Sequence, residues 1–249
     1  RATRYSARDN NKNRLKNIVG IAKNLLLDFL YPKTCARCGV FGAFLCIECK
    51  DALRIHAPQC FICNRRSLDA RICVSCRRHT EYIRMYSPLR YMERPVSTMV
   101  QRMKYRNAKE YGEILATLLN SALTRYSISP PKNSVVVAVP LHPLRERARG
   151  FNQAEVMARI YAERSKLPLA SAEALVRTKN TPPQAKEEKR NERFENIRDA
   201  FYVRDATDVF GRTAILIDDV ATTGATINEA TAALKRGGAK AVWVFTAAR

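Results

Sequence analysis

The chain has 249 residues, of which 46% are hydrophobic, so it is long and apolar enough for one full domain with a smaller module, and global disorder is excluded. Its 44 Lys and Arg residues outnumber its 23 Asp and Glu residues and give a formal net charge of +21. Solubility alone needs far less charge, so the excess indicates phosphate-bearing partners: nucleic acid, a polyphosphorylated small molecule, or both.

The first expected element in chain order is an amphipathic helix within residues 1–31. Residues 1–14 are polar and basic, and from residue 15 the apolar residues recur with a period of 3.6 and stop near Pro32. We favour packing of this helix against the segment that follows, because its apolar stripe is narrow. The alternative is peripheral binding at the inner membrane face, with Lys16 and Lys23 on the polar side.

The sequence predicts no transmembrane segment and no exported protein. No apolar stretch reaches the roughly 18 residues that a membrane helix requires. The basic N-terminus also lacks the apolar core and cleavage site of a signal peptide. We therefore expect a cytoplasmic protein.

All eight cysteines lie in Cys-x-x-Cys pairs within residues 32–80. Each pair places two thiolates on one side of a tight turn, which suits a tetrahedral zinc ion, whereas disulfides would need an oxidising compartment. The short spacers favour two sequential structural zinc sites and hence a double zinc ribbon, with interleaved ligation left open. The first predicted site is Cys35, Cys38, Cys46 and Cys49, and the second is Cys60, Cys63, Cys73 and Cys76.

The cysteine-rich segment has two interpretations. We favour a scaffold that folds around its metals, because about forty residues with few large apolar side chains hold too small a core. The alternative is a basic surface with aromatic side chains for single-stranded nucleic acid. Its residues would be Arg65, Arg66, Arg71, Arg77 and Arg78, with Phe41, Phe44 and Phe61.

Residues 81–249 alternate between amphipathic stretches and short apolar runs. We expect helices over 97–105, 111–126, 151–165 and 227–236, and strands over 134–139, 214–217 and 241–246. This order predicts an α/β doubly wound, mostly parallel sheet. Ligands of such sheets bind at the carboxyl ends of the strands, which places the candidate site after Val139 and after Ile217.

Residues 215–226, ILIDDVATTGAT, carry the strongest functional signal. Asp218 and Asp219 follow a buried strand, and a turn rich in hydroxyls leads into the next helix, where backbone N–H groups form an anion cradle. Gly224 lets a phosphate approach the backbone. Paired acids beside a phosphate make sense when the ligand offers hydroxyls, as ribose 5-phosphate does. An alternative, with Thr226 as helix cap and the acids as turn residues, leaves the paired acids unexplained.

This stretch resembles the phosphoribosyl pyrophosphate signature of type I phosphoribosyltransferases. From about residue 26 onward the chain is similar to the ComF family: the paired cysteines are followed by VPLHPLRERARGFNQAE, then TPPQAKEEKRNERFENIRDAF, then the signature. The resemblance implies a type I phosphoribosyltransferase fold for 81–249, preceded by the zinc module.

The resemblance also implies roles for individual residues. Asp218 and Asp219 would hold the ribose, directly or through Mg²⁺, and are the catalytic candidates. They would form the ribose and 5′-phosphate site together with Ala221, Thr222, Thr223, Gly224, Ala225 and Thr226. Pyrophosphate would bind the loop 140–150 through Arg145, Arg147, Arg149 and Gly150. His142, Asn152 and Gln153 are left as either packing and capping groups or ligand contacts.

The hydrophilic stretch 178–198 resembles the mobile lid of phosphoribosyltransferases, with a linker as the alternative. The family resemblance implies a ComF-type protein that binds phosphoribosyl pyrophosphate, acts in DNA uptake during natural transformation, and binds single-stranded DNA, with a competence helicase as a further partner. The alternative is an active phosphoribosyltransferase that transfers ribose 5-phosphate to a nitrogenous base or amine and releases pyrophosphate. The sequence indicates no acceptor site.

Overall fold

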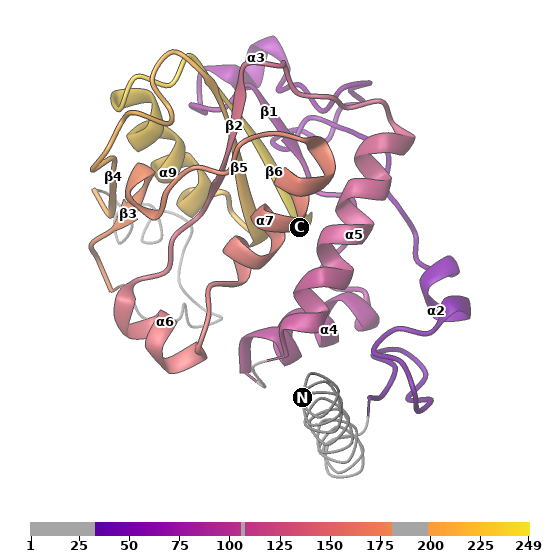
Figure 1. Ribbon diagram of the computed structural model, residues 1–249. Coiled ribbons are helices and arrows are strands. Elements are labelled where there is room, and N and C mark those ends of the chain that lie inside the picture. The colour runs from indigo at the N-terminus through magenta and orange to yellow at the C-terminus, as the bar shows by residue number, and fades with distance from the viewer. Residues whose placement is uncertain (1–32, 106–107, 181–198) are drawn as a thin grey trace, which may run out of the picture. The chain divides into compact units, whose positions relative to one another are not determined.

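The computed structural model describes residues 33–105, 108–180 and 199–249 (Figure 1). The chain divides into two compact units, Arg1–Ala52 and Leu53–Arg249. This division falls between the two cysteine groups, inside the segment 32–80 that we expected to form one module. The expected helix within residues 1–31 lies outside the described residues, as does most of the expected lid.

The larger unit is built on a four-stranded parallel sheet with the order β1-β6-β5-β2. The strands are β1 (Arg84–Tyr86), β2 (Ser134–Ala138), β5 (Thr213–Val220) and β6 (Ala241–Ala248). The register aligns Val136 with Ile215 and Ile215 with Trp243. The three strands expected from apolar runs are confirmed, whereas the three-residue β1 was not predicted, because its length gives no periodic signal.

Helices cover both faces of the sheet, which confirms the predicted doubly wound fold (Figure 1). Alternate strand residues such as Val137, Leu216 and Val244 share a buried cluster with α9 (Ala225–Arg236). The opposite face meets α5 (Lys109–Arg125) and α7 (Gln153–Ser165), where Tyr161 packs edge-on against Phe245 at 5.7 Å between ring centroids. Burial on both faces explains why these strands read as continuous apolar runs.

Two further helices position the site. Helix α4 (Arg94–Tyr105) packs against α5, and α6 (Pro143–Arg149) follows β2. The prediction of a loop over residues 140–150 was therefore wrong. Pro143 begins α6, His142 Nδ1 accepts a hydrogen bond from Leu144 N at 3.3 Å, and Gly150 ends the helix with φ +76°.

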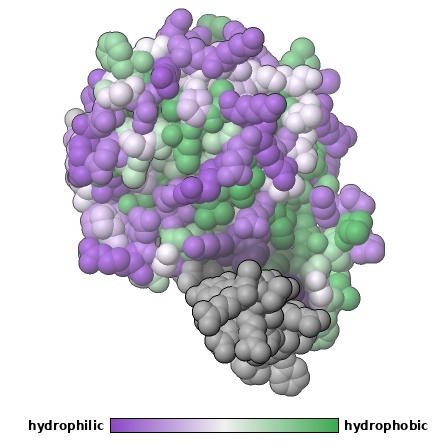
Figure 2. Space-filling view, in the orientation of Figure 1, coloured by the Kyte–Doolittle hydropathy of each residue, from purple (hydrophilic) through white to green (hydrophobic). Residues whose placement is uncertain are grey.

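The remaining elements are short. Helix α2 (Ile47–Asp51) lies in the smaller unit; α3 (Val74–Arg77), the 3₁₀ turn η1 (Ala172–Ala174) and the antiparallel pair β3 (Val176–Arg177) and β4 (Phe201–Tyr202) belong to the larger one. On the face shown in Figure 2, hydrophilic side chains cover most of the described surface. Among the described residues, no helix combines the length and apolar character that crossing a bilayer requires.

Candidate phosphate and metal sites

A cleft of about 320 Å³ lies at the carboxyl ends of β2 and β5, where parallel sheets of this kind bind ligands. Segments far apart in the sequence meet there: the last turn of α4, residues 139–154, the end of β3 and residues 218–226. The charged residues of the cleft are four cations and two acids: Lys104, Arg145, Arg149, Arg177, Asp218 and Asp219. The excess of positive charge suits an anionic ligand.

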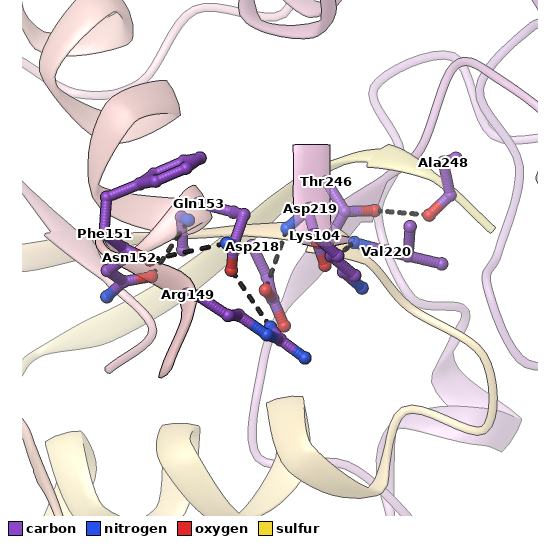
Figure 3. A network of polar contacts seen from close by, with 11 residues as sticks. Lys104, Arg149, Phe151, Asn152, Gln153, Asp218, Asp219, Val220, Thr246 and Ala248 are labelled. Carbon is purple, nitrogen blue, oxygen red and sulfur yellow. Dashed lines mark hydrogen bonds and ion pairs between the residues drawn. The ribbon is translucent and has the colours of Figure 1, made fainter. Parts of the chain in front are cut away.

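The two acids sit at the end of β5. Asp218 Oδ1 accepts a hydrogen bond from Asp219 N at 2.8 Å, and Asp219 Oδ1 accepts one from Val220 N at 2.7 Å. The side chain of Asp219 is 8% exposed, and its Oδ2 lies 2.8 Å from Lys104 Nζ (Figure 3). Burial first, and the neighbouring Asp219 second, raise the pKa of Asp218 to about 7.

Lys104 was not predicted as a site residue. It lies in the last turn of α4, and its side chain is 24% exposed. Burial acts to lower its pKa, but the carboxylates of Asp219 and Asp218 outweigh burial and raise it. In the sequence Lys104 is one cation among many, and only the packing of α4 brings it to β5.

Arg145 and Arg149 line the cleft from one face of α6. Arg149 Nη1 donates to Gln153 Oε1 at 3.0 Å, and Gln153 is itself buried (Figure 3). Arg145 Nη2 is buried and has no hydrogen-bond partner in the part of the chain that the structure describes. Burial and the nearby Arg149 lower the pKa of Arg145. A buried donor needs an acceptor, which a polar ligand or an ordered water molecule can supply.

Arg147 is exposed and is not among the cleft residues. Helix geometry explains why: Arg145 and Arg149 are four residues apart and share a face, whereas Arg147 falls on the other side. The prediction had treated residues 140–150 as a loop, in which this distinction does not arise. Gly150 serves as the C-cap of α6 and is likewise not part of the cleft lining.

Arg177, at the end of β3, is a second cleft residue that the sequence did not reveal. It is 7% exposed, with its guanidinium carbon 5.3 Å from the centroid of the Phe201 ring, and burial lowers its pKa. Asn152, left open by the sequence, caps α7: its Oδ1 accepts from Ala154 N at 3.0 Å, and its Nδ2 donates to Val139 O at 3.1 Å. Asn152 therefore ties the end of β2 to the start of α7.

Residues 221–226, which we call the phosphate loop, comprise the connection that follows β5 and the first two residues of α9. Gly224 is the N-cap of α9 with φ +79°, so Thr226 is not the cap. Thr222 and Thr226 line the cleft, and Thr223 Oγ1 accepts a hydrogen bond from Ala225 N at 3.4 Å. Ala221 and Ala225 are buried on the inner side of the loop. The first-turn N–H groups of a helix lack intrahelical acceptors, so this turn favours an anion.

The structure gathers the cysteines into the two sequential groups, Cys35, Cys38, Cys46 and Cys49, and Cys60, Cys63, Cys73 and Cys76. In each group the sulfur atoms lie within 4.8 Å of one another. Cys38 and Cys46 Sγ are 3.7 Å apart, and Cys63 and Cys73 Sγ are 3.6 Å apart. Zinc–sulfur bonds of 2.3 Å give a tetrahedron with edges of about 3.8 Å, so both groups fit a tetrahedral metal ion.

Phe61 does not fit the alternative in which aromatic side chains of the cysteine-rich segment bind single-stranded nucleic acid. Its side chain is 7% exposed, whereas that of Phe41 is 73% exposed. Phe61 instead belongs to the buried cluster of the larger unit, together with Ala221 and Ala225 of the phosphate loop. A stacking contact with a nucleotide base requires an exposed ring, so Phe61 has a packing role.

The larger unit has a parallel sheet with helices on both faces, and its cleft lies beside two consecutive acids at the end of a strand. Together these features define a phosphoribosyltransferase-type domain. A family model described as a phosphoribosyl transferase domain matches residues 149–249. Competence protein ComFC of Bacillus subtilis is 30% identical, over 82% of this chain and 84% of the relative. The chain belongs to the ComF family.

Two further relatives cover similar lengths. Competence protein F of Haemophilus influenzae is 28% identical over 84% of this chain and 98% of the relative. DNA utilization protein YhgH of Escherichia coli is 28% identical over 82% of this chain and 90% of the relative.

Proposed function

We propose that the cleft binds phosphoribosyl pyrophosphate together with Mg²⁺. The observation that carries this proposal is that Arg145, whose buried Nη2 has no acceptor among the described residues, lines the same cleft as the two acids. A ligand with phosphates alone would offer no hydrogen-bond donor to Asp218 and Asp219. A ligand with hydroxyls alone would leave the arginine unsatisfied, so a phosphorylated sugar accounts for both.

In this proposal each part of the ligand meets a different part of the chain. Thr222, Thr226 and the first turn of α9 receive the 5′-phosphate. Asp218 and Asp219 accept hydrogen bonds from the ribose hydroxyls or hold Mg²⁺, which prefers carboxylate and phosphate oxygens. The guanidinium groups of Arg145 and Arg149 face the pyrophosphate and pair with its oxygens.

Isothermal titration calorimetry of the whole protein tests this proposal. We expect phosphoribosyl pyrophosphate to bind with Mg²⁺ at one site per chain, and ribose 5-phosphate and pyrophosphate each to bind more weakly than the whole ligand. Binding of pyrophosphate alone with the affinity of the whole ligand would contradict the assignment of the ribose to the acids.

Transfer of ribose 5-phosphate to a nitrogenous base or amine is the alternative to binding alone. The same cleft would then position the ribose, and the cations of α6 would stabilise charge that develops on the leaving pyrophosphate. Pyrophosphate release in the presence of a panel of bases and amines distinguishes the two readings. Release that requires both an acceptor and Asp218 would establish turnover.

We also infer a role in handling DNA, as the names of the competence and DNA utilization relatives suggest. A second hollow, of about 800 Å³, supports nucleic-acid binding by this chain. It lies between the ends of α5 and α7 and the segment 128–132 that precedes β2, at the opposite end of the sheet from the cleft. Its charged lining residues are all cations: Arg125, Lys132, Arg164 and Lys166.

Fluorescence anisotropy of a labelled single-stranded oligonucleotide at several salt concentrations tests whether this hollow, a basic groove, binds nucleic acid. The double variant Lys132→Ala with Lys166→Ala should weaken binding and reduce the slope of log affinity against log salt by about 1.4, because each lost phosphate contact removes about 0.7. The control is Lys235→Ala with Lys240→Ala, which removes the same charge from exposed positions outside the groove. An equal effect of both pairs would show that only net charge matters.

A further inference from the structure

The second cysteine group packs directly against the phosphate loop. Phe61 lies between the metal-ligand candidates Cys60 and Cys63, and a Cβ atom placed on Gly224 would be 3.2 Å from Phe61 Cε1. The same Cβ would be 3.6 Å from Tyr82 Oη. Both aromatic side chains are buried, Phe61 at 7% and Tyr82 at 1% exposure. The Cys60–Cys63 turn thus packs the ring of Phe61 closely against the backbone of Gly224.

Several contacts hold Phe61 and the cysteine segment in place. Arg249 Nη2 donates to Phe61 O at 3.4 Å, and its guanidinium carbon lies 4.7 Å from the centroid of the Phe61 ring. Glu81 N donates to Asn228 Oδ1 at 3.1 Å, which joins the end of the cysteine segment to the second turn of α9. Cys60 and Cys76 lie in the same buried cluster as Ala221 and Ala225.

The Cys60–Cys63 turn contributes two of the four thiols that meet at one point. Asn64 N donates to Cys60 O at 2.9 Å, and Asn64 adopts a left-handed conformation with φ +61°. The sulfur atoms of two separate turns lie close together here, and no disulfide joins them. Metal binding and folding are coupled in such small sites.

We infer that the metal at Cys60, Cys63, Cys73 and Cys76 positions the phosphate loop through Phe61, so that metal binding and sugar-phosphate binding are thermodynamically coupled. The ligand part of this inference rests on the proposed function. Phe61 is a positioning residue: its ring supports Gly224 in the left-handed conformation that opens α9 toward the cleft. Because coupling between two sites is reciprocal, the ligand must tighten metal binding by the same factor as the metal tightens ligand binding.

Hydrogen exchange of residues 218–228 tests the structural part without any ligand. Cys63→Ser and Cys38→Ser are matched variants, because each removes the exposed member of its own cysteine group. We expect faster exchange of the phosphate loop in Cys63→Ser and in Phe61→Leu, and no change in Cys38→Ser. Cys63→His, which keeps a zinc ligand, should restore slow exchange.

The ligand part is tested by calorimetry and by chelator competition for bound zinc. Phe61→Leu should lower the affinity for phosphoribosyl pyrophosphate about tenfold, within the usual range of coupling between sites. Saturating ligand should slow zinc loss from wild-type protein but not from Phe61→Leu.

Unchanged loop exchange in a Cys63→Ser protein that has lost one zinc would overturn the inference, as would an equal effect of Cys38→Ser. If wild-type protein fails to bind phosphoribosyl pyrophosphate, the proposed function falls, and the exchange experiment still decides whether the metal positions the loop. If Cys63→Ser does not fold, Phe61→Leu tests the role of the ring, and hydrogen exchange of wild-type protein before and after removal of zinc by a chelator tests the role of the metal.

Discussion

Lys104 Nζ lies 2.8 Å from Asp219 Oδ2, although the two residues are far apart in the chain and belong to α4 and β5. Both residues of this ion pair line the cleft. It gives the more buried of the two acids a counter-ion before any ligand binds.

Removing the cation should therefore destabilise the protein. Lys104→Met leaves the Asp219 carboxylate buried without its partner, and we expect a loss of about 2 kcal/mol or more in the free energy of unfolding. Denaturant unfolding at pH 7.5 measures this change. The double variant Lys104→Met with Asp219→Asn should recover most of the loss, and failure to recover it would show that Lys104 acts by packing alone.

The raised pKa of Asp218 predicts that the stability of the folded protein depends on pH. Its pKa is raised from an ordinary value of 3.8 to about 7, by burial first and by Asp219 second, with Lys104 and Arg177 acting in the opposite direction. Between these two values the unfolded chain releases a proton that the folded chain keeps, so this group's contribution to stability falls as the pH rises. Above about pH 7 the contribution is level.

The variant Asp218→Asn removes this titration. Its melting temperature relative to wild type should rise between pH 4.5 and pH 7 and then stay constant, which differential scanning calorimetry at several pH values would show. A difference that does not change with pH would contradict the raised pKa. Ligand affinity should fall as the pH drops below about 7 in wild type, because the neutral acid no longer holds a hydroxyl or Mg²⁺ as well.

Gly224→Ala should be more costly than Gly211→Ala. Both glycines have positive φ, +79° and +71°, so alanine is strained by about 1 kcal/mol at either position. A Cβ at Gly211 meets nothing within 4 Å, whereas one at Gly224 presses on Phe61. The difference between the two losses of unfolding free energy isolates the contact with Phe61. Equal losses would argue against close packing of Phe61 on Gly224.

Metal content offers a separate prediction. Because both cysteine groups have sulfur separations that fit a tetrahedral ion, elemental analysis of the purified protein should find two zinc ions per chain. Cys38→Ser and Cys63→Ser should each lower the count by about one. Retention of two ions in either variant would mean that ligation does not follow the sequential groups.

The sequence predicted most of the fold because its signals are local. The strands around Val136 and Ile215 are short apolar runs, and the helices have clear periods. The acids and the hydroxyl-rich turn of the cleft are likewise adjacent in the chain. Their residue types and order are enough to predict an anion site.

What the sequence did not reveal depends on long-range packing. Lys104 and Arg177 reach the cleft from elements without any motif, and the chain holds 44 basic residues among which nothing distinguishes them. The inward position of Phe61 was hidden for the same reason, since a residue within a Cys-x-x-Cys turn reads equally well as exposed or buried. The exposed position of Arg147 outside the cleft lining was hidden because a short helix was taken for a loop.

The most direct test of the central claim compares two arginines on α6 by calorimetry with phosphoribosyl pyrophosphate and Mg²⁺. Arg145 has a buried guanidinium nitrogen in the cleft, whereas Arg147 is exposed two residues away. We predict that Arg145→Gln loses at least tenfold in affinity, about 1.4 kcal/mol, while Arg147→Gln stays close to wild type. Equal affinities for the two variants, or no binding by the wild-type protein, would contradict a phosphorylated sugar in this cleft.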